Sequence, residues 1–244
     1  MNGNNLIFKN PLFNNNKKTP INTKNDNRPK TTNTNTNNTQ QNVLIQKEKE
    51  KKSDTLIISF AGYALLYGGI PRIEFFNFLS KHFTNIDTEF YLDESKNLYH
   101  CGITNISTDI QTTVDYLRPI VSKYSNVIFL GVSAGGYAAI LFGSLLNITS
   151  VVAFIPPTNL RSRNKNIEEE YRNIQKHINK TTNYYIYGDS AISDVNDHHH
   201  ISHCENIAIY PNVHLTRING VDMKTIRNNG MLFQIISHAI GRGT

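Results

Sequence analysis

The chain has 244 residues and a formal net charge of +6, and its basic residues are unevenly distributed. Residues 1–52 contain ten Lys and Arg against three Asp and Glu, a net charge of +7, whereas residues 53–244 contain 15 against 16, a net charge of −1. We therefore expect one domain of ordinary size behind a basic appendage, and the sequence has no apolar run long enough to cross a bilayer.

The appendage is rich in Asn, Thr and Lys and has few branched or aromatic apolar residues after Phe13. Such a segment cannot bury enough apolar surface to offset its loss of chain entropy, so we expect a disordered basic tail at 1–52. Its charge can attract acidic partners non-specifically. The N-terminus lacks the apolar core of a signal peptide, and the two cysteines, Cys101 and Cys204, fit a reducing compartment. We therefore expect an intracellular, cytoplasmic protein.

From residue 53 onwards, short apolar runs alternate with segments of helical periodicity. In chain order the pattern predicts a strand at 56–60, a helix at 72–83, a strand at 87–91, a helix at 108–124 that contains Pro119, a strand at 127–130, a helix at 134–146, strands at 151–155, 184–187 and 213–218, and a helix at 231–240. The polar stretch 156–180 predicts a short helical insertion over the carboxyl edge of the sheet. The fold class is α/β, a mainly parallel sheet with helices on both faces.

A G-x-S-x-G pentapeptide, Gly131-Val132-Ser133-Ala134-Gly135, lies between the predicted strand 127–130 and the predicted helix 134–146. The glycines permit a tight turn, because larger side chains there would collide with the strand and the helix behind it. A serine at the tip of such a turn is exposed above the sheet. This is the position in which a serine hydrolase needs its nucleophile.

Strand, turn and helix in this order resemble the α/β-hydrolases, and the resemblance extends over nearly all of residues 54–241. Three stretches, 59–62, 133–139 and 226–232, also resemble a little-characterised hydrolase-like group. The resemblance implies an α/β-hydrolase-like domain at 53–244, in which the nucleophile is followed in the chain by an acid and then by a histidine after the last strand.

The same resemblance implies an oxyanion site beside Ser133. One donor would be the backbone N–H of Ala134, directly after the serine, and the second would come from the loop after the first strand, at Gly62 or Tyr63. Gly62 also has the simpler interpretation of a turn that ends a strand.

The acid is implied at Asp189, which directly follows the predicted strand 184–187 and Gly188. Asp194 and Asp197 lie in the same loop and compete with it. An aspartate after a glycine is also a common turn former, so a purely local role for Asp189 stays open.

The histidine departs from the family pattern. Residues 219–224, after the last strand, contain none; Asp222 or Met223 stands at the expected position, and neither side chain can readily deprotonate a hydroxyl. A histidine cluster follows the acid strand instead, with Asp197 leading into three consecutive histidines. We expect His200 to supply the base, with Asp189 or Asp194 as its orienting carboxylate.

The cluster also has a spacing that can hold zinc, since His199 with His203, and His200 with Cys204, would each share a helix face. No second cluster completes such a site in the sequence, so we predict neither a metal nor another cofactor.

Three hypotheses follow. The first is a serine hydrolase of the esterase, thioesterase or amidase type, which forms an acyl-enzyme at Ser133 with a small-molecule, acyl or glycan-type substrate. The second is a catalytically inactive hydrolase-like binding or scaffolding protein that has lost the base. The third gives the main role to the basic tail, as a tether to nucleic acid or a membrane.

Overall fold

The computed structural model describes residues 51–63, 66–67, 70–71, 75–160 and 167–241, and within them six parallel strands form one sheet in the order β4-β1-β5-β6-β7-β8. The strands are β1 (Thr55–Phe60), β4 (Asp87–Tyr91), β5 (Asn126–Val132), β6 (Ser150–Phe154), β7 (Asn183–Asp189) and β8 (Val213–Ile218). All six predicted strands are confirmed within three residues at each end. A separate antiparallel pair, β2 (Leu66–Tyr67) and β3 (Ile70–Pro71), was not expected from the sequence.

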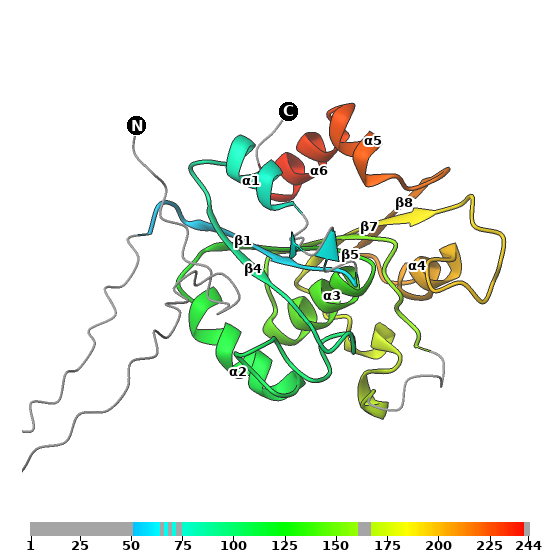
Figure 1. Cartoon of the computed structure of the whole chain (residues 1–244), viewed down its shortest axis with the longest axis horizontal. Coiled ribbons are helices and arrows are strands. Elements are labelled where there is room, and N and C mark those ends of the chain that lie inside the picture. Colours follow the sequence, from blue (N-terminus) through cyan, green and yellow to red (C-terminus); the bar gives the residue numbers. More distant parts are fainter. Residues whose placement is uncertain (1–50, 64–65, 68–69, 72–74, 161–166, 242–244) are drawn as a thin grey trace, which may run out of the picture.

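Helices cover both faces of the sheet, as Figure 1 shows. One face carries α1 (Phe76–His82), α5 (Met223–Asn228) and α6 (Met231–Ala239), and the other carries α2 (Ile110–Val121), α3 (Ala134–Leu146) and α4 (Ile201–Ile207). The α/β class is therefore confirmed. The predicted helix 72–83 corresponds to α1, which begins at Phe76, so the prediction is wrong at Phe75; residues 72–74 lie outside those described.

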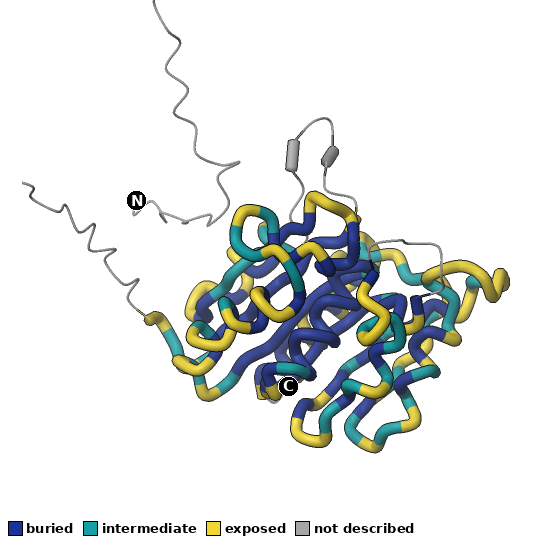
Figure 2. The backbone as a smooth tube through the Cα atoms, turned by 90° about the horizontal axis from the view of Figure 1, so that it is seen from below, coloured by how far each residue is buried: buried dark blue, intermediate teal, exposed yellow. Residues whose placement is uncertain are grey.

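Two apolar layers form because alternate residues of each strand point to opposite faces. In β5, Val127 and Phe129 pack in the layer that contains α3, whereas Ile128, Leu130 and Val132 pack in the layer that contains α1 and α6. Figure 2 shows the resulting continuous buried centre, with exposed residues confined to the outer loops and helix faces.

Helix α3 is buried along nearly its whole length, which explains why its sequence is apolar all round. Its outer side is covered by the segment after β6, where Ile167, Ile174 and Ile178 join the same apolar layer. The predicted helical insertion consists, in its described part, of two 3₁₀ turns, η2 (Glu169–Tyr171) and η3 (Ile174–His177). Residues 161–166 lie outside those described.

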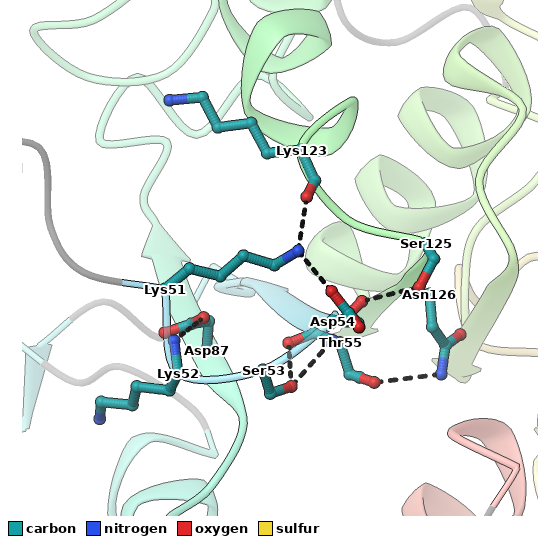
Figure 3. A network of polar contacts seen from close by, with 9 residues as sticks. All are labelled: Lys51, Lys52, Ser53, Asp54, Thr55, Asp87, Lys123, Ser125 and Asn126. Atoms are coloured by element: carbon teal, nitrogen blue, oxygen red, sulfur yellow. Dashed lines mark hydrogen bonds and ion pairs between the residues drawn. The ribbon is translucent and has the colours of Figure 1, made fainter.

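The start of the domain is fastened by polar contacts (Figure 3). The Lys51 ammonium lies 2.6 Å from Asp54 Oδ1 and donates to the carbonyl of Lys123 at 2.9 Å, and the Lys52 N–H donates to Asp87 Oδ2 at 2.9 Å. These two lysines, which the charge boundary assigns to the tail, thus contact the domain. The predicted disorder of residues 1–50 concerns a segment outside those described.

Helices that are both long and apolar enough to span a membrane do not occur in the part of the chain that the structure describes.

Candidate active site

Ser133 occupies a sharp turn between β5 and α3. Its backbone angles, φ 54° and ψ −120°, lie outside the usual range of a non-glycine residue, and its N–H donates to the Phe154 carbonyl at 2.9 Å. A Cβ atom added at Gly131 would lie 2.1 Å from the carbonyl oxygen of Gly135, and one added at Gly135 would lie 2.0 Å from that of Phe60. The turn therefore requires both glycines of the pentapeptide.

The Ser133 hydroxyl has an imidazole beside it: Ser133 Oγ lies 2.7 Å from His199 Nε2. Both side chains are partly buried, and His199 belongs to the loop that leaves the carboxyl end of β7. If the ring is neutral and accepts the serine proton at Nε2, its own proton is on Nδ1. This pairing of a hydroxyl with a basic nitrogen is the arrangement that activates a serine nucleophile.

The structure places His199 at the serine instead of the predicted His200. His200 Nδ1 accepts from the Ser202 N–H at 3.2 Å and contacts its hydroxyl at 2.9 Å, so this ring caps the start of α4. A local backbone contact determines which of His199 and His200 reaches the serine. Asp197 Oδ1 accepts the backbone N–H of His199 at 2.7 Å, which forms an Asx turn that the Asp-x-His spacing permits.

Asp189 lies at the end of β7, as expected, but its carboxylate is occupied by backbone donors. It accepts N–H bonds from Ala191 at 2.8 Å, Gly220 at 3.0 Å and Val221 at 2.7 Å. Burial raises the pKa of this carboxyl, but the three donors outweigh burial and the resulting pKa is below the ordinary value. Asp189 thus fastens the turn after β8, the position at which the resemblance implies a histidine.

Asp197 lies close to the ring, with its Oδ1 at 3.7 Å from His199 Nδ1. Asp194, the third candidate acid, accepts the N–H of Asn196 at 2.9 Å and closes the preceding turn. Burial lowers the pKa of His199 below its ordinary value, while Asp197 and Asp189 partly offset this by favouring the protonated ring. His199 is therefore neutral at neutral pH and able to accept a proton.

The expected oxyanion donors lie at the same edge of the sheet. Ala134 is the first residue of α3, so the helix supplies no acceptor for its N–H. The loop after β1 approaches the turn closely, since the Cβ added at Gly135 would lie 3.0 Å from the Ala61 carbonyl carbon. Gly62 and Tyr63 follow directly, and Tyr63 is exposed. The oxyanion role of Gly62, Tyr63 and Ala134 stays a prediction.

The histidine cluster does not converge on a metal position. Among the described residues, no group of three or more His, Cys, Asp or Glu side chains is arranged to hold a metal ion. His203 Nδ1 accepts from the Asn159 N–H at 3.4 Å, and Cys204 is fully buried beneath Gly188. Burial raises the pKa of the Cys204 thiol to about 12, which fits a packing role.

No protein-family model and no curated protein matches this sequence. Solved structures do match. Esterase 2 of Thermogutta terrifontis, phosphorylated by paraoxon, has a TM-score of 0.54 and 13% identity over 80% of this chain and 86% of its own. The capsule O-acetyltransferase of Neisseria meningitidis serogroup A has a TM-score of 0.53 and 18% identity over 77% of this chain and 88% of its own. A variant of that acetyltransferase in complex with CoA has a TM-score of 0.51. The chain therefore has the α/β-hydrolase fold.

Proposed function

We propose that the protein is a serine hydrolase of the esterase, thioesterase or amidase type, with Ser133 as its nucleophile. The observation that carries this proposal is the 2.7 Å contact between Ser133 Oγ and His199 Nε2. The serine lies on a strained turn that requires glycine at positions 131 and 135. A serine held there for packing alone would have no need of a partly exposed imidazole at its hydroxyl.

The chemistry divides into two half-reactions. His199 accepts the Ser133 proton as Oγ bonds to the carbonyl carbon, and the oxyanion that develops is stabilised by the Ala134 N–H and by a donor at Gly62 or Tyr63. His199 then gives the proton to the leaving group, whose bond to the carbonyl carbon breaks, and the acyl group stays on Ser133. In the second half-reaction His199 takes a proton from water as the water oxygen bonds to the acyl carbon, and it returns a proton to Ser133 Oγ as the Oγ–carbon bond breaks and the acid leaves.

We assign two different tasks to the carboxylates. Asp197 lies beside His199 Nδ1 and fixes the backbone of that residue, so it orients the ring and stabilises the imidazolium that forms. Asp189 acts at longer range: it holds the turn at Gly220 and Val221 and adds a second negative charge that favours the imidazolium.

The similar structures also suggest a related reaction, acyl transfer to a hydroxyl group. The acyl-enzyme can be attacked by the hydroxyl of another molecule in place of water, and the O-acetyltransferase shares this fold. The two reactions differ only in the acceptor, since both begin with acylation of Ser133. An inactive binding protein, the alternative suggested by the missing histidine after β8, has less support because His199 provides an imidazole from another loop.

A fluorophosphonate probe tests the proposal, because it phosphonylates only activated serines. The folded wild-type protein should take one label, at Ser133, and Ser133→Ala should take none. Ser190→Ala is the matched control: its hydroxyl lies on the same edge of the sheet but donates to the Ile218 carbonyl at 3.1 Å, so labelling should persist. A folded wild-type protein that stays unlabelled would overturn the proposal.

A further inference from the structure

Three strained residues lie around one residue, Phe154, next to the candidate nucleophile. Phe75, Ser133 and Ile155 have φ values of 65°, 54° and 42°, in the left-handed region that non-glycine residues rarely adopt. Each is tied to Phe154: the Phe75 ring lies 6.2 Å from the Phe154 ring, the Ser133 N–H donates to the Phe154 carbonyl, and Ile155 follows it in the chain. Strain of this kind is typical of functional positions.

Ile155 is the least expected of the three. It is β-branched, and it precedes Pro156, so both its own side chain and the following ring favour an extended backbone. The conformation is held by two hydrogen bonds: the Ile155 N–H donates to the Tyr187 carbonyl at 2.7 Å, and the Phe154 carbonyl accepts from Ser133 at 2.9 Å. The position of Ile155 is thus coupled to the backbone of the nucleophile.

The side chains around Phe154 form an apolar surface. Phe154 itself is fully buried, and the Tyr187 ring stacks on it with centroids 4.9 Å apart. Strand register sets Val132, Phe154 and Tyr187 side by side in one row across β5, β6 and β7, and their side chains belong to the same apolar layer. Phe75, Ile155 and Tyr187 pack against that layer while staying partly exposed.

The opposite face near the serine is polar. One helical turn beyond Ser133, the Tyr137 hydroxyl donates to the Tyr171 carbonyl at 2.7 Å and lies 2.9 Å from His100 Nε2. His100 Nδ1 in turn accepts the Glu168 N–H at 3.1 Å. These groups are already hydrogen-bonded to one another, so this part of the opposite face is polar among the described residues.

We infer that Phe75, Ile155 and Tyr187 form a subsite for a short aliphatic acyl group of the substrate, with Phe154 as its floor. The inference rests on the proposed function and specifies its substrate: an ester or thioester of a short fatty acid. The subsite begins one residue from the carbonyl that accepts the Ser133 N–H. Because it consists of only these three partly exposed side chains, we expect it to hold an acyl chain of a few carbons.

The test compares p-nitrophenyl acetate, butyrate and octanoate. Each buried methylene is worth roughly a fourfold change, so kcat/KM of the wild-type protein should rise about tenfold from acetate to butyrate and rise no further with octanoate. Ile155→Asn should reduce the butyrate preference to about twofold. Asparagine has a similar size and tolerates a positive φ, so this variant should fold. The matched control is Ile209→Asn, because Ile209 is 70% exposed and lies before the amino end of β8.

A binding measurement separates this inference from the proposed function. Ser133→Ala should bind p-nitrophenyl butyrate more tightly than the acetate in calorimetry, and Ile155→Asn in that background should remove the difference. A protein that takes no fluorophosphonate but keeps this difference has the subsite without the activity. A wild-type preference that Ile155→Asn leaves unchanged, or equal binding of both esters, would overturn the subsite.

Discussion

Replacing His199 by alanine tests whether the base is His199, as the structure indicates, or His200, as expected from the sequence. The substitution removes the nitrogen that lies 2.7 Å from Ser133 Oγ, and with it the proton acceptor for the nucleophile. General-base catalysis contributes about 10² to 10⁴ in rate, so kcat/KM for p-nitrophenyl acetate should fall roughly a thousandfold, or about 4 kcal/mol of transition-state stabilisation. The His199 ring is only partly buried, so the melting temperature should change little.

His200→Ala is the matched control, since the two histidines are adjacent in the chain. This substitution removes the acceptor for the Ser202 N–H at the start of α4. Loss of this helix cap should lower the free energy of unfolding by about 1 kcal/mol and the melting temperature by roughly 2–4 °C. Activity should stay within about twofold of wild type. The assay is initial-rate ester hydrolysis at neutral pH, alongside thermal unfolding of both variants.

The result that would refute the reasoning is the reverse pattern. If His200→Ala lost activity while His199→Ala kept it, the loop would have to rearrange on substrate binding. Free imidazole provides a further check, because it should partly restore the rate of His199→Ala and should leave the His200→Ala rate unchanged.

Three further predictions follow from the same geometry. Because a protonated His199 cannot act as a base and burial lowers its pKa, kcat/KM should rise with pH through a midpoint below 6.5, and Asp197→Asn should move this midpoint lower; a midpoint above 6.5 would contradict the assignment. Gly135→Ala should gain up to about 1 kcal/mol of helix propensity but lose about 3 kcal/mol because the new Cβ clashes with the Phe60 carbonyl. The melting temperature should therefore fall by several degrees, and an unchanged melting temperature would exclude a tight turn. Asp189→Ala should lower the free energy of unfolding, measured in urea, by about 3 kcal/mol, because three backbone donors lose their charged acceptor. A loss of activity without a loss of stability would show instead that Asp189 acts directly on the His199 ring.

The strands could be predicted because most of them are short runs of mainly apolar residues. Strand β6 is buried at every position and apolar from Val151 to Phe154, as expected for a strand covered on both faces of a parallel sheet. The short helices α4 and α5 have no comparable pattern, since each spans fewer than eight residues. Their capping residues gave no clear signal either, because the sequence suggested a catalytic base at His200 and placed Asp222 where the resemblance implies a histidine. The antiparallel strands β2 and β3 pair through only two residues each, so they are equally hard to predict from the sequence.

The site was predicted in part. Ser133 and its turn follow from the pentapeptide in its strand-and-helix context. The position of Asp189 follows from the strand before it, but its carboxylate binds backbone donors in place of the predicted histidine. The choice among three consecutive histidines could not be made, because it depends on which backbone N–H the Asp197 side chain accepts and which ring caps α4. Those contacts are set by the local turn, which hydrophobic periodicity does not encode. The strained peptide at Ile155 also has no signal in the sequence, since prolines after it favour an extended conformation.

Trapping the acyl-enzyme tests the central claim most directly. The protein would be mixed with p-nitrophenyl acetate, quenched in acid during the first turnovers and digested for mass spectrometry. We predict one acetyl group on the peptide that contains Ser133, and none on that peptide in Ser133→Ala. Hydrolysis of the ester with no acetyl group on this peptide, or an acetyl group found on another side chain, would contradict the assignment of Ser133 as the nucleophile.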